Sequence, residues 1–578
     1  MNRSTLSICL ALILFLISAC GSGGHKERQE LRALVNAGQY DKAIEYVEKS
    51  AFYAKEDVAL LKNLELGLIH NYAGNYYQSA KYLEKAKEIH QKLFTVSIGS
   101  AAKTLVMNDN ADIYYGQKYE RSLIHFYLAL DHYLLSQLGV YEGYKQGEKV
   151  IAEQKLSRDQ ARLELMGARA EILAWDSYLE WLKNDRQGES VFKNDLLAKL
   201  FGGIIHERMG SGSDLETALQ LYKDAKILVF RNYNAYPTFN ASAVKFKQDF
   251  KKLPKLGEEK VKKDYVRSTV FEDELNDFLD YKILSLTKRL RPSGLKETIR
   301  QIGANPKIVE KVQKEGRDQP NVSLIVQDGM IPQKIPVTSY YSLESALTPD
   351  NPTETQKKIA QIGSQVIMIF AASQLGLLPP PNNYSPVGME IGVRVAAVAA
   401  SGMAIGFELP GMENKPIEKQ MAVRVYDEKG GHIKDYHLPV VNPLVDLARE
   451  AIAEDSASRY TRIGIRLATK HLTAILASYG TYSLMKNKAG DWLAKSAAVA
   501  QYMAAAQGIA ATEKADTRYW STLPSNFRMI DMLLPKGKYS LKLVSYNSKT
   551  PDVKVTSDLG TVEVTNPKQK SIFSYRIP

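Results

Sequence analysis

The chain has 578 residues, a formal net charge of +12 and only two cysteines. A hydrophobic content of 45% and a charged content of 24% are ordinary for globular protein, which excludes wholesale disorder. Both cysteines, Cys9 and Cys20, lie in the first 20 residues. Zinc–thiolate sites and cysteine-based redox chemistry are therefore excluded from the rest of the chain.

The first residues predict export and a lipid anchor. Arg3 supplies a short positive region, and residues 6–17 are apolar apart from Ser7. This is the layout of a secretory signal, too short for a membrane-spanning helix. The small residues before Cys20 resemble the lipobox of bacterial lipoproteins, which implies removal of residues 1–19 and acylation of Cys20. An ordinary signal peptide with a chance cysteine is the alternative.

Residues 20–30 then form a tether that begins with four glycine and serine residues, 21–24. Gly21 and Ser22 stand where an aspartate often retains a lipoprotein in the inner membrane. By resemblance to such sorting rules, we expect an anchor in the outer membrane that faces the periplasm.

Residues 31–235 contain a helical pattern that recurs. A glycine or serine begins each copy, a small residue follows five positions on, and another small residue follows seven after that. The copies are 38–43 with Ser50, 74–79 with Ala86, and 213–218 with Ala225. Small residues let paired helices approach closely, so the pattern resembles the tetratricopeptide repeat, whose stacked hairpins form a solenoid that binds protein segments. Generic helical hairpins remain the alternative.

Residues 236–320 are predicted to be a basic helical linker region. Residues 282–314 hold nine basic residues against two acidic ones. No aromatic residues interleave with this run, so the stacking platform of single-strand nucleic-acid binders is missing, and we expect no nucleic-acid partner. A solvated face is the simpler interpretation, and contact with anionic lipid or a protein partner is the other.

Residues 321–578 are predicted to be a second domain rich in strands. Residues 322–326 and 331–337 flank Asp328-Gly329, which predicts a hairpin or a pair of edge strands. Residues 421–438 predict a strand pair. Together with strands expected at 526–546, 553–564 and 571–577, they predict a small antiparallel sheet or sandwich. The fold class is therefore α+β, an all-α tetratricopeptide-like solenoid followed by this domain.

A helical hairpin is predicted within this domain at residues 446–512. Residues 446–485 are amphipathic, and residues 492–512 carry nine alanines that permit close packing. Four basic residues fall on the polar face of the first helix and are candidate contacts for a partner or an anion: Arg459, Arg462, Arg466 and Lys470. A solvated face is the simpler interpretation of this stripe.

Asp516, Arg518 and Trp520 form a second candidate group between the alanine-rich helix and the last strands. In an extended chain, alternate residues point the same way, so the arginine can pair with the aspartate. We favour a structural junction for the three residues, with recognition of a small anionic ligand as the alternative.

Motifs of catalysis are missing from the sequence. HExxH, GxSxG, Walker A and GxGxxG patterns do not occur, and two matches to SxxK lack their companion motifs. We therefore predict no catalytic residues, no metal and no cofactor.

Several stretches, in order along the chain, resemble the uncharacterised bacterial tetratricopeptide-containing lipoproteins. They are 108–121, 200–225, 323–334 and 515–524. The resemblance implies a lipid-anchored cell-envelope protein with no assigned activity and suggests a link to the regulation of peptidoglycan synthesis. We expect a non-enzymatic scaffold with envelope protein partners. An envelope hydrolase or transferase acting on glycan or peptide is the alternative.

Overall fold

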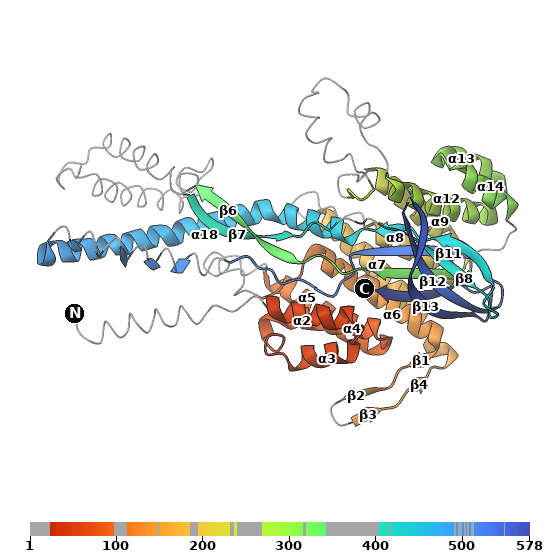
Figure 1. Cartoon of the computed structure of the whole chain (residues 1–578), viewed down its shortest axis with the longest axis horizontal. Coiled ribbons are helices and arrows are strands. Elements are labelled where there is room, and N and C mark those ends of the chain that lie inside the picture. Colours follow the sequence, from red (N-terminus) through yellow and green to blue (C-terminus); the bar gives the residue numbers. More distant parts are fainter. Residues whose placement is uncertain are drawn as a thin grey trace, which may run out of the picture.

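The computed structural model (Figure 1) describes most of the chain after residue 23. The described residues are 24–97, 113–146, 149–184, 195–231, 236–239, 269–315, 320–342, 404–490 without 416 and 418, isolated positions between 493 and 509, and 514–578 without 548 and 549. The predicted signal, Cys20 and residues 343–403 lie outside these residues.

The N-terminal half is a layer of helices in which each helix packs against the next. The helices are α2 (His25–Asn36), α3 (Tyr40–Lys49), η1 (Glu56–Val58), α4 (Ala59–Tyr72), α5 (Tyr76–Ser97), α6 (Lys118–Leu138), α7 (Arg158–Asn184), α8 (Leu196–Met209) and α9 (Gly212–Arg231). Gly38 and Gly74 adopt φ of 68° and 80° between paired helices. This left-handed conformation is the reason the repeat pattern carries glycine there.

Five of the six small residues of the repeat pattern lie where helices meet, and the sixth, Ser50, is half-buried at the end of α3. Ala43, Ser79, Ala86, Ala218 and Ala225 are all fully buried. A larger side chain at these positions would hold the helices apart, so the predicted close approach of the helices is confirmed.

Helix α12 (Val270–Leu290) continues the helical layer and packs against α9. The short helices η4 (Pro292–Gly294), α13 (Leu295–Ile302) and α14 (Pro306–Lys314) follow. Phe271, Leu275 and Leu279 of α12 are buried in the same core as the preceding helices. The described part of the region predicted as a linker therefore packs as part of the helical layer.

Two four-stranded sheets lie beside the helices. The middle sheet has the order β10 (Val440–Asn442), β11 (Asn526–Met532), β5 (Val322–Asp328), β14 (Ser571–Ile577). The outer sheet has the order β13 (Thr550–Val564), β12 (Gly537–Asn547), β8 (Gln420–Tyr426), β9 (His432–His437). The strand pair predicted at 421–438 is confirmed as β8 and β9.

Two predictions about these strands are wrong. β14 runs parallel to β5, so the middle sheet is mixed rather than antiparallel. β5 is a central strand, and it forms no hairpin with β6 (Lys334–Ser342), which pairs with β7 (Ala404–Met412) in a separate two-stranded sheet. After the turn at Gly329, the Ile331 amide donates instead to the Leu523 carbonyl at 2.9 Å, which takes the chain away from β5.

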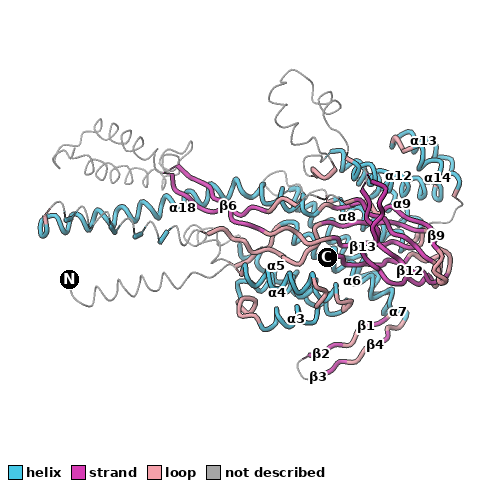
Figure 2. The backbone as a smooth tube through the Cα atoms, in the orientation of Figure 1, coloured by secondary structure: helices cyan, strands magenta, loops and turns pink. Residues whose placement is uncertain are grey.

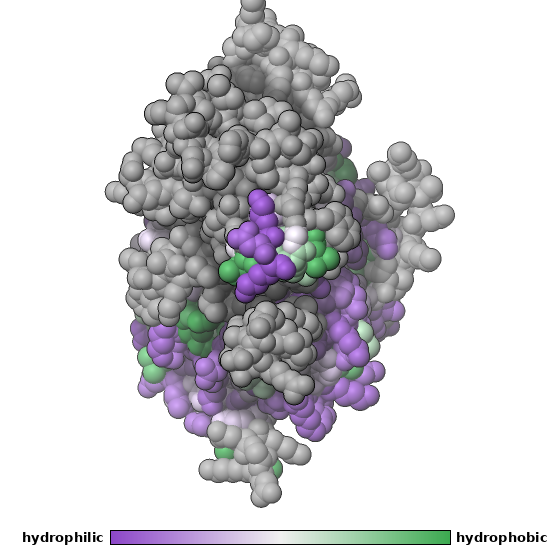
Figure 3. Space-filling view, turned by 90° about the vertical axis from the view of Figure 1, so that its left-hand side faces the viewer, coloured by the Kyte–Doolittle hydropathy of each residue, from purple (hydrophilic) through white to green (hydrophobic). Residues whose placement is uncertain are grey.

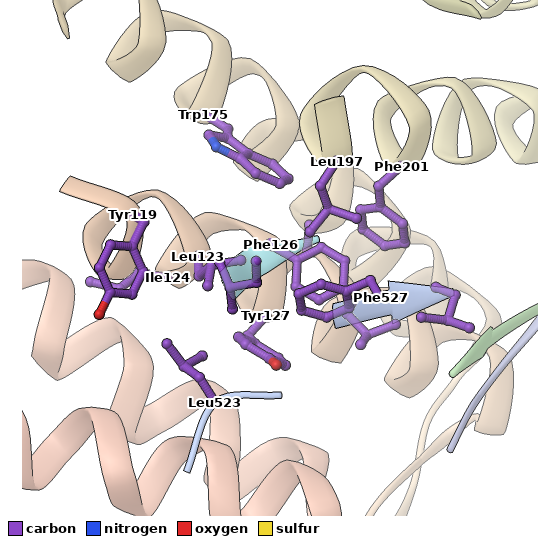
Figure 4. Close-up of a cluster of buried hydrophobic side chains, with 14 of the residues drawn as sticks. Tyr119, Leu123, Ile124, Phe126, Tyr127, Trp175, Leu197, Phe201, Leu523 and Phe527 are labelled. Carbon is purple, nitrogen blue, oxygen red and sulfur yellow. The ribbon is translucent and has the colours of Figure 1, made fainter. Parts of the chain in front are cut away.

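The middle sheet is buried on both faces. Ile325 and Phe527 point into the core shared with the helices, whereas Leu324 and Val326 point into the core shared with the outer sheet. Phe126 of α6 lies at the centre of the first core, with ring centroids 5.0 Å from both Phe201 and Phe527 (Figure 4). The result is three layers, one of helices and two of strands.

A small β-ribbon joins α6 to α7. Its strands are β1 (Val140–Tyr141), β2 (Tyr144–Gln146), β3 (Lys149–Ile151) and β4 (Gln154–Lys155). β1 pairs with β4, and β2 pairs with β3.

A long arm projects from the three layers (Figures 1 and 2). It contains α18 (Leu444–Ala489), a 46-residue helix about 69 Å long at 1.5 Å per residue, and the strands β6 and β7. The chain then turns at Gly490, and the described positions between 493 and 509 are helical. Tyr482 packs near Ala494, and Ile509 packs near Ile463 and Leu467, so the antiparallel helical hairpin is confirmed. None of the described helices is long and apolar enough to cross a membrane.

We expect Ala218→Glu to destabilise the protein by about 3 kcal/mol or more, because it places an unpaired carboxylate in an apolar helix contact. Chemical unfolding of the chain without its first 20 residues measures the effect. Thr217→Glu, on the exposed side of the same helix, is the matched control. Equal stability of the two variants would show that the helix contact is misassigned.

Candidate functional site

The candidate junction residues lie in a segment without regular secondary structure, 514–525, which runs from the arm into the middle sheet. The Arg518 guanidinium donates to both carboxylate oxygens of Asp516, at 2.9 and 3.0 Å, which confirms the predicted pairing. Burial by itself raises the pKa of Asp516, but Arg518 and then Lys334 outweigh it and hold that pKa below its usual range. Both partners are mostly buried, so the pair is strongly held.

Trp520 is fully buried, and its main chain is bound by Glu120 of α6. The Trp520 amide donates to Glu120 Oε1 at 2.8 Å. The other carboxylate oxygen accepts from the Gln117 amide at 2.6 Å, within a capping box, and from the Tyr114 hydroxyl. Glu120 therefore caps its own helix and binds the segment at the same time.

Glu65 of α4 binds the next two residues and was missed by sequence reasoning. Its Oε1 accepts from the amide and hydroxyl of Ser521, at 2.8 and 2.7 Å. Its Oε2 accepts from the amide and hydroxyl of Thr522, at 3.3 and 2.5 Å. Complete burial raises the pKa of Glu65, and the four donors counteract that only in part. One signal was available, because Glu65 is the single acid in a mostly apolar helix.

The carbonyl groups of the segment are bound as well. Arg32 of α2 donates to the Ser521 carbonyl at 2.8 Å, and the Tyr72 hydroxyl of α4 donates to the Thr522 carbonyl at 3.0 Å. The helical layer thus contacts donors and acceptors of an extended main chain, as peptide-binding proteins do. These hydrogen bonds fix residues 520–522 against the helical layer.

The predicted basic stripe on α18 is not a single solvated face. Arg466 is buried, and Lys470 is half-buried, whereas the side chains of Arg459 and Arg462 lie outside the described residues. Ile463 and Leu467 turn toward Phe407 and Leu409 of β7, so the buried face includes position 466. The sequence placed Arg466 on the opposite face because β7 was not foreseen as the packing partner.

Four charges are buried between the helices and the sheets. They belong to Glu207 of α8, Lys282 of α12, Asp531 of β11 and Lys570 beside β14. Lys570 lies 2.5 Å from Glu207 and 2.8 Å from Asp531, and Lys282 pairs with both acids. Burial alone raises the pKa of Asp531, but the two lysines lower it well below its usual range. The sequence suggested that Lys282 belongs to a solvated basic face. In the structure Lys282 is buried and pairs with two acids instead.

An open cavity of about 770 Å³ lies between α9, α12 and the end of α13. Its lining includes four acids, Glu272, Asp273, Asp277 and Asp280. The Asp277 carboxylate accepts from the Asn305 side chain at 2.7 Å, and Asp280 accepts from the Asn305 amide at 2.9 Å. Asp277 and Asp280 therefore hold in place Asn305, the residue before α14. Among the described residues, no group of three or more histidine, cysteine or acidic side chains is placed to hold a metal ion.

Helix α7 is apolar on two opposite faces. Ala168, Ile172, Trp175 and Leu179 are buried toward the other helices. About half a turn away, at 100° per residue, the solvent-facing side carries a second apolar row, Leu163 (69% exposed), Met166 (42%), Leu173 (57%) and Trp181 (37%). We call this row the α7 stripe. Apolar residues at helical spacing on an exposed face are typical of interaction surfaces.

Comparison with known proteins yields no matching family model, no matching curated protein and no matching solved structure.

We expect Arg518→Ala and Trp520→Ala each to destabilise the protein by about 3 kcal/mol or more, since one leaves a buried carboxylate unpaired and the other leaves a large cavity. Thermal and chemical unfolding of the chain without its first 20 residues measure this, with Lys514→Ala, at an exposed position of the same segment, as the control. If both variants unfold like the wild type but lose binding of an anionic ligand or a protein, the segment is a recognition site instead.

Proposed function

We propose that the chain is a non-enzymatic scaffold of the cell envelope, lipid-anchored through Cys20 to the outer membrane on its periplasmic side. The proposal begins with the signal and lipobox-like residues that precede Cys20. The region from residue 31 to 235 would act as a tetratricopeptide-like interaction module. The consecutive helix pairs, with glycine at turns and small residues in the contacts, support that interpretation.

One surface of this module is already occupied by the chain itself. Glu65, Glu120 and Arg32 contact the main chain of residues 520–522. A protein partner therefore needs a different face, and the observation that carries the proposal is the α7 stripe. It spans 19 residues, from Leu163 to Trp181, or about 27 Å of helix.

The partner that best fits the α7 stripe is a second copy of this chain. One flank of the stripe carries the exposed Arg162 in its N-terminal half and the exposed Glu180 in its C-terminal half, whereas Arg169 and Asp176 on the same flank already pair with Asp214 and Lys199 of this chain. When two such helices pack antiparallel, Arg162 of each faces Glu180 of the other, whereas parallel packing opposes like charges. A single helix pair buries less than the roughly 1,000 Å² of a stable interface, so the dimer is weak in solution. Anchoring to one membrane raises the effective concentration and favours it.

The anchor is tested with Cys20→Ala. We expect the variant to incorporate no fatty-acid analogue in living cells, because the mature chain has no other thiol. The wild type should carry the label and sediment with the outer membrane on density fractionation. Label on the variant contradicts acylation at Cys20, and wild type found mainly with the inner membrane contradicts the location.

Self-association is tested with Leu173→Asp in the unlipidated chain. We expect the average mass of the wild type, measured by analytical ultracentrifugation, to rise toward the dimer with concentration, whereas the variant stays monomeric. Leu484→Asp, on the arm, is a matched control with an exposed leucine of similar size.

Reversing the flanking charges tests whether the partner at the α7 stripe is a second copy of this chain or a different protein. Arg162→Glu should weaken the dimer, and adding Glu180→Arg should restore it. A wild type that stays monomeric at every concentration, or a lack of restoration, contradicts the antiparallel dimer.

A further inference from the structure

The outer half of the arm is free of charged residues. Residues 471–485 of α18 contain no aspartate, glutamate, lysine or arginine, and neither do residues 496–512. Charges gather only between these two stretches, at Lys486, Lys488, Asp491 and Lys495. Each stretch is 15 or more residues long, or about 22 Å of helix. Charged residues are expected on helices that are exposed to water. The absence of charge in these two stretches therefore indicates that they contact something other than water.

The two stretches lie beside each other in the hairpin. The Thr481 hydroxyl donates to the Gln501 side chain at 2.5 Å, and Tyr482 packs near Ala494. The described positions of both helices therefore lie side by side near the end of the arm. We call the described residues from 471 to 509 the distal hairpin.

The tip of the distal hairpin combines exposed apolar and basic side chains. Leu484 is 72% exposed and Leu493 is 46% exposed. Lys486 and Lys488 are exposed beside them. Seen from the side on which the arm projects, the described surface of the molecule is mostly hydrophilic (Figure 3), and these two leucines belong to the smaller set of large apolar side chains that are exposed. Leucine next to lysine is the composition of helices that lie in a membrane interface.

The arm and the start of the body lie close together. The Arg28 side chain of α2 donates to Thr517 at 3.3 Å, in the segment that returns from the arm. The Ala515 amide donates to Glu408 of β7 at 3.3 Å, at the base of the arm. In Figure 1, α2 lies on the side of the body from which α18 projects. The first described helix is thus next to the base of the arm.

A lipid on Cys20 would keep that base near the bilayer. His25 is the fifth residue after Cys20, and five fully extended residues span about 17 Å. From Ile463 to Ala489, α18 continues outward for 26 residues, or about 39 Å. The arm is therefore longer than the tether, and its distal hairpin is within reach of the membrane surface.

We propose that the distal hairpin lies in the interface of the membrane that holds the anchor, with Leu484 and Leu493 in the acyl boundary and Lys486 and Lys488 at the lipid phosphates. The proposal rests on the lipid anchor proposed above. Lying along the interface suits an uncharged stretch of about 22 Å, which is shorter than the roughly 30 Å hydrocarbon core. It also keeps the basic tip in contact with water and phosphate, where lysine is stable.

Vesicle flotation tests the proposal with the chain that lacks its first 20 residues, so no lipid anchor contributes. We expect the wild type to float with vesicles of phosphatidylglycerol and phosphatidylethanolamine, and to float less in high salt. Leu484→Asp with Leu493→Asp should lower the bound fraction about tenfold or more, since two apolar contacts are lost and two like charges are added. Leu138→Asp, at an exposed leucine of α6 outside both the arm and the α7 stripe, should bind like the wild type.

Trp492, which directly precedes Leu493 in the sequence, supplies a second measurement. Trp175 and Trp520 are buried in the body. We expect brominated lipids to quench the fluorescence of the wild type and of Trp181→Phe, and to leave Trp492→Phe unquenched. Wild type that neither floats nor is quenched, or a double aspartate variant that floats normally, refutes the membrane contact. Labelling of Cys20 is measured independently of flotation and quenching. The experiments therefore distinguish a failure of the proposed membrane contact from a failure of the proposed lipid anchor.

Discussion

Two buried carboxylates hold the molecule together at the place where its halves meet. Glu65 and Glu120 are desolvated by the helical layer, and each needs donors that its own helix cannot fully supply. Residues 520–522 provide those donors with three backbone amides and two hydroxyls. The dependence is mutual, because the same amides would otherwise be buried without acceptors. This exchange explains why an irregular segment can run through the protein interior.

The charges farther along the layer boundary follow the same principle. Lys282 comes from the helices, Asp531 from a strand and Lys570 from the chain before the last strand. The two lysines and the two acids can pair with one another only when the helices and the sheets are correctly aligned. Apolar packing around Phe126 supplies most of the burial, whereas these polar contacts specify a single arrangement of the layers.

Sequence reasoning recovered what local patterns encode. Glycines at turns and small residues at helix contacts identified the helix pairs, and alternation identified most strands. The Asp516–Arg518 pair was predictable because its members are two residues apart. The parallel pairing of β14 with β5 was not, since it joins residues about 250 positions apart. The role of Glu65 was hidden for the same reason, and Arg466 was misplaced because its face is chosen by β7, an element that local periodicity does not reveal.

The central position of β5 has a consequence for biogenesis. Both of its neighbours, β11 and β14, follow it by roughly 200 residues or more, and residues 517–522 bond to side chains as early as Arg28. The helical layer therefore cannot complete its core while the C-terminal strands are still unmade. Nucleation across such sequence separations is slow, because loop closure costs entropy before contacts compensate it. A nascent chain of this design stays open until its last strands are made, so its apolar surfaces are accessible to proteases and chaperones for the whole of synthesis.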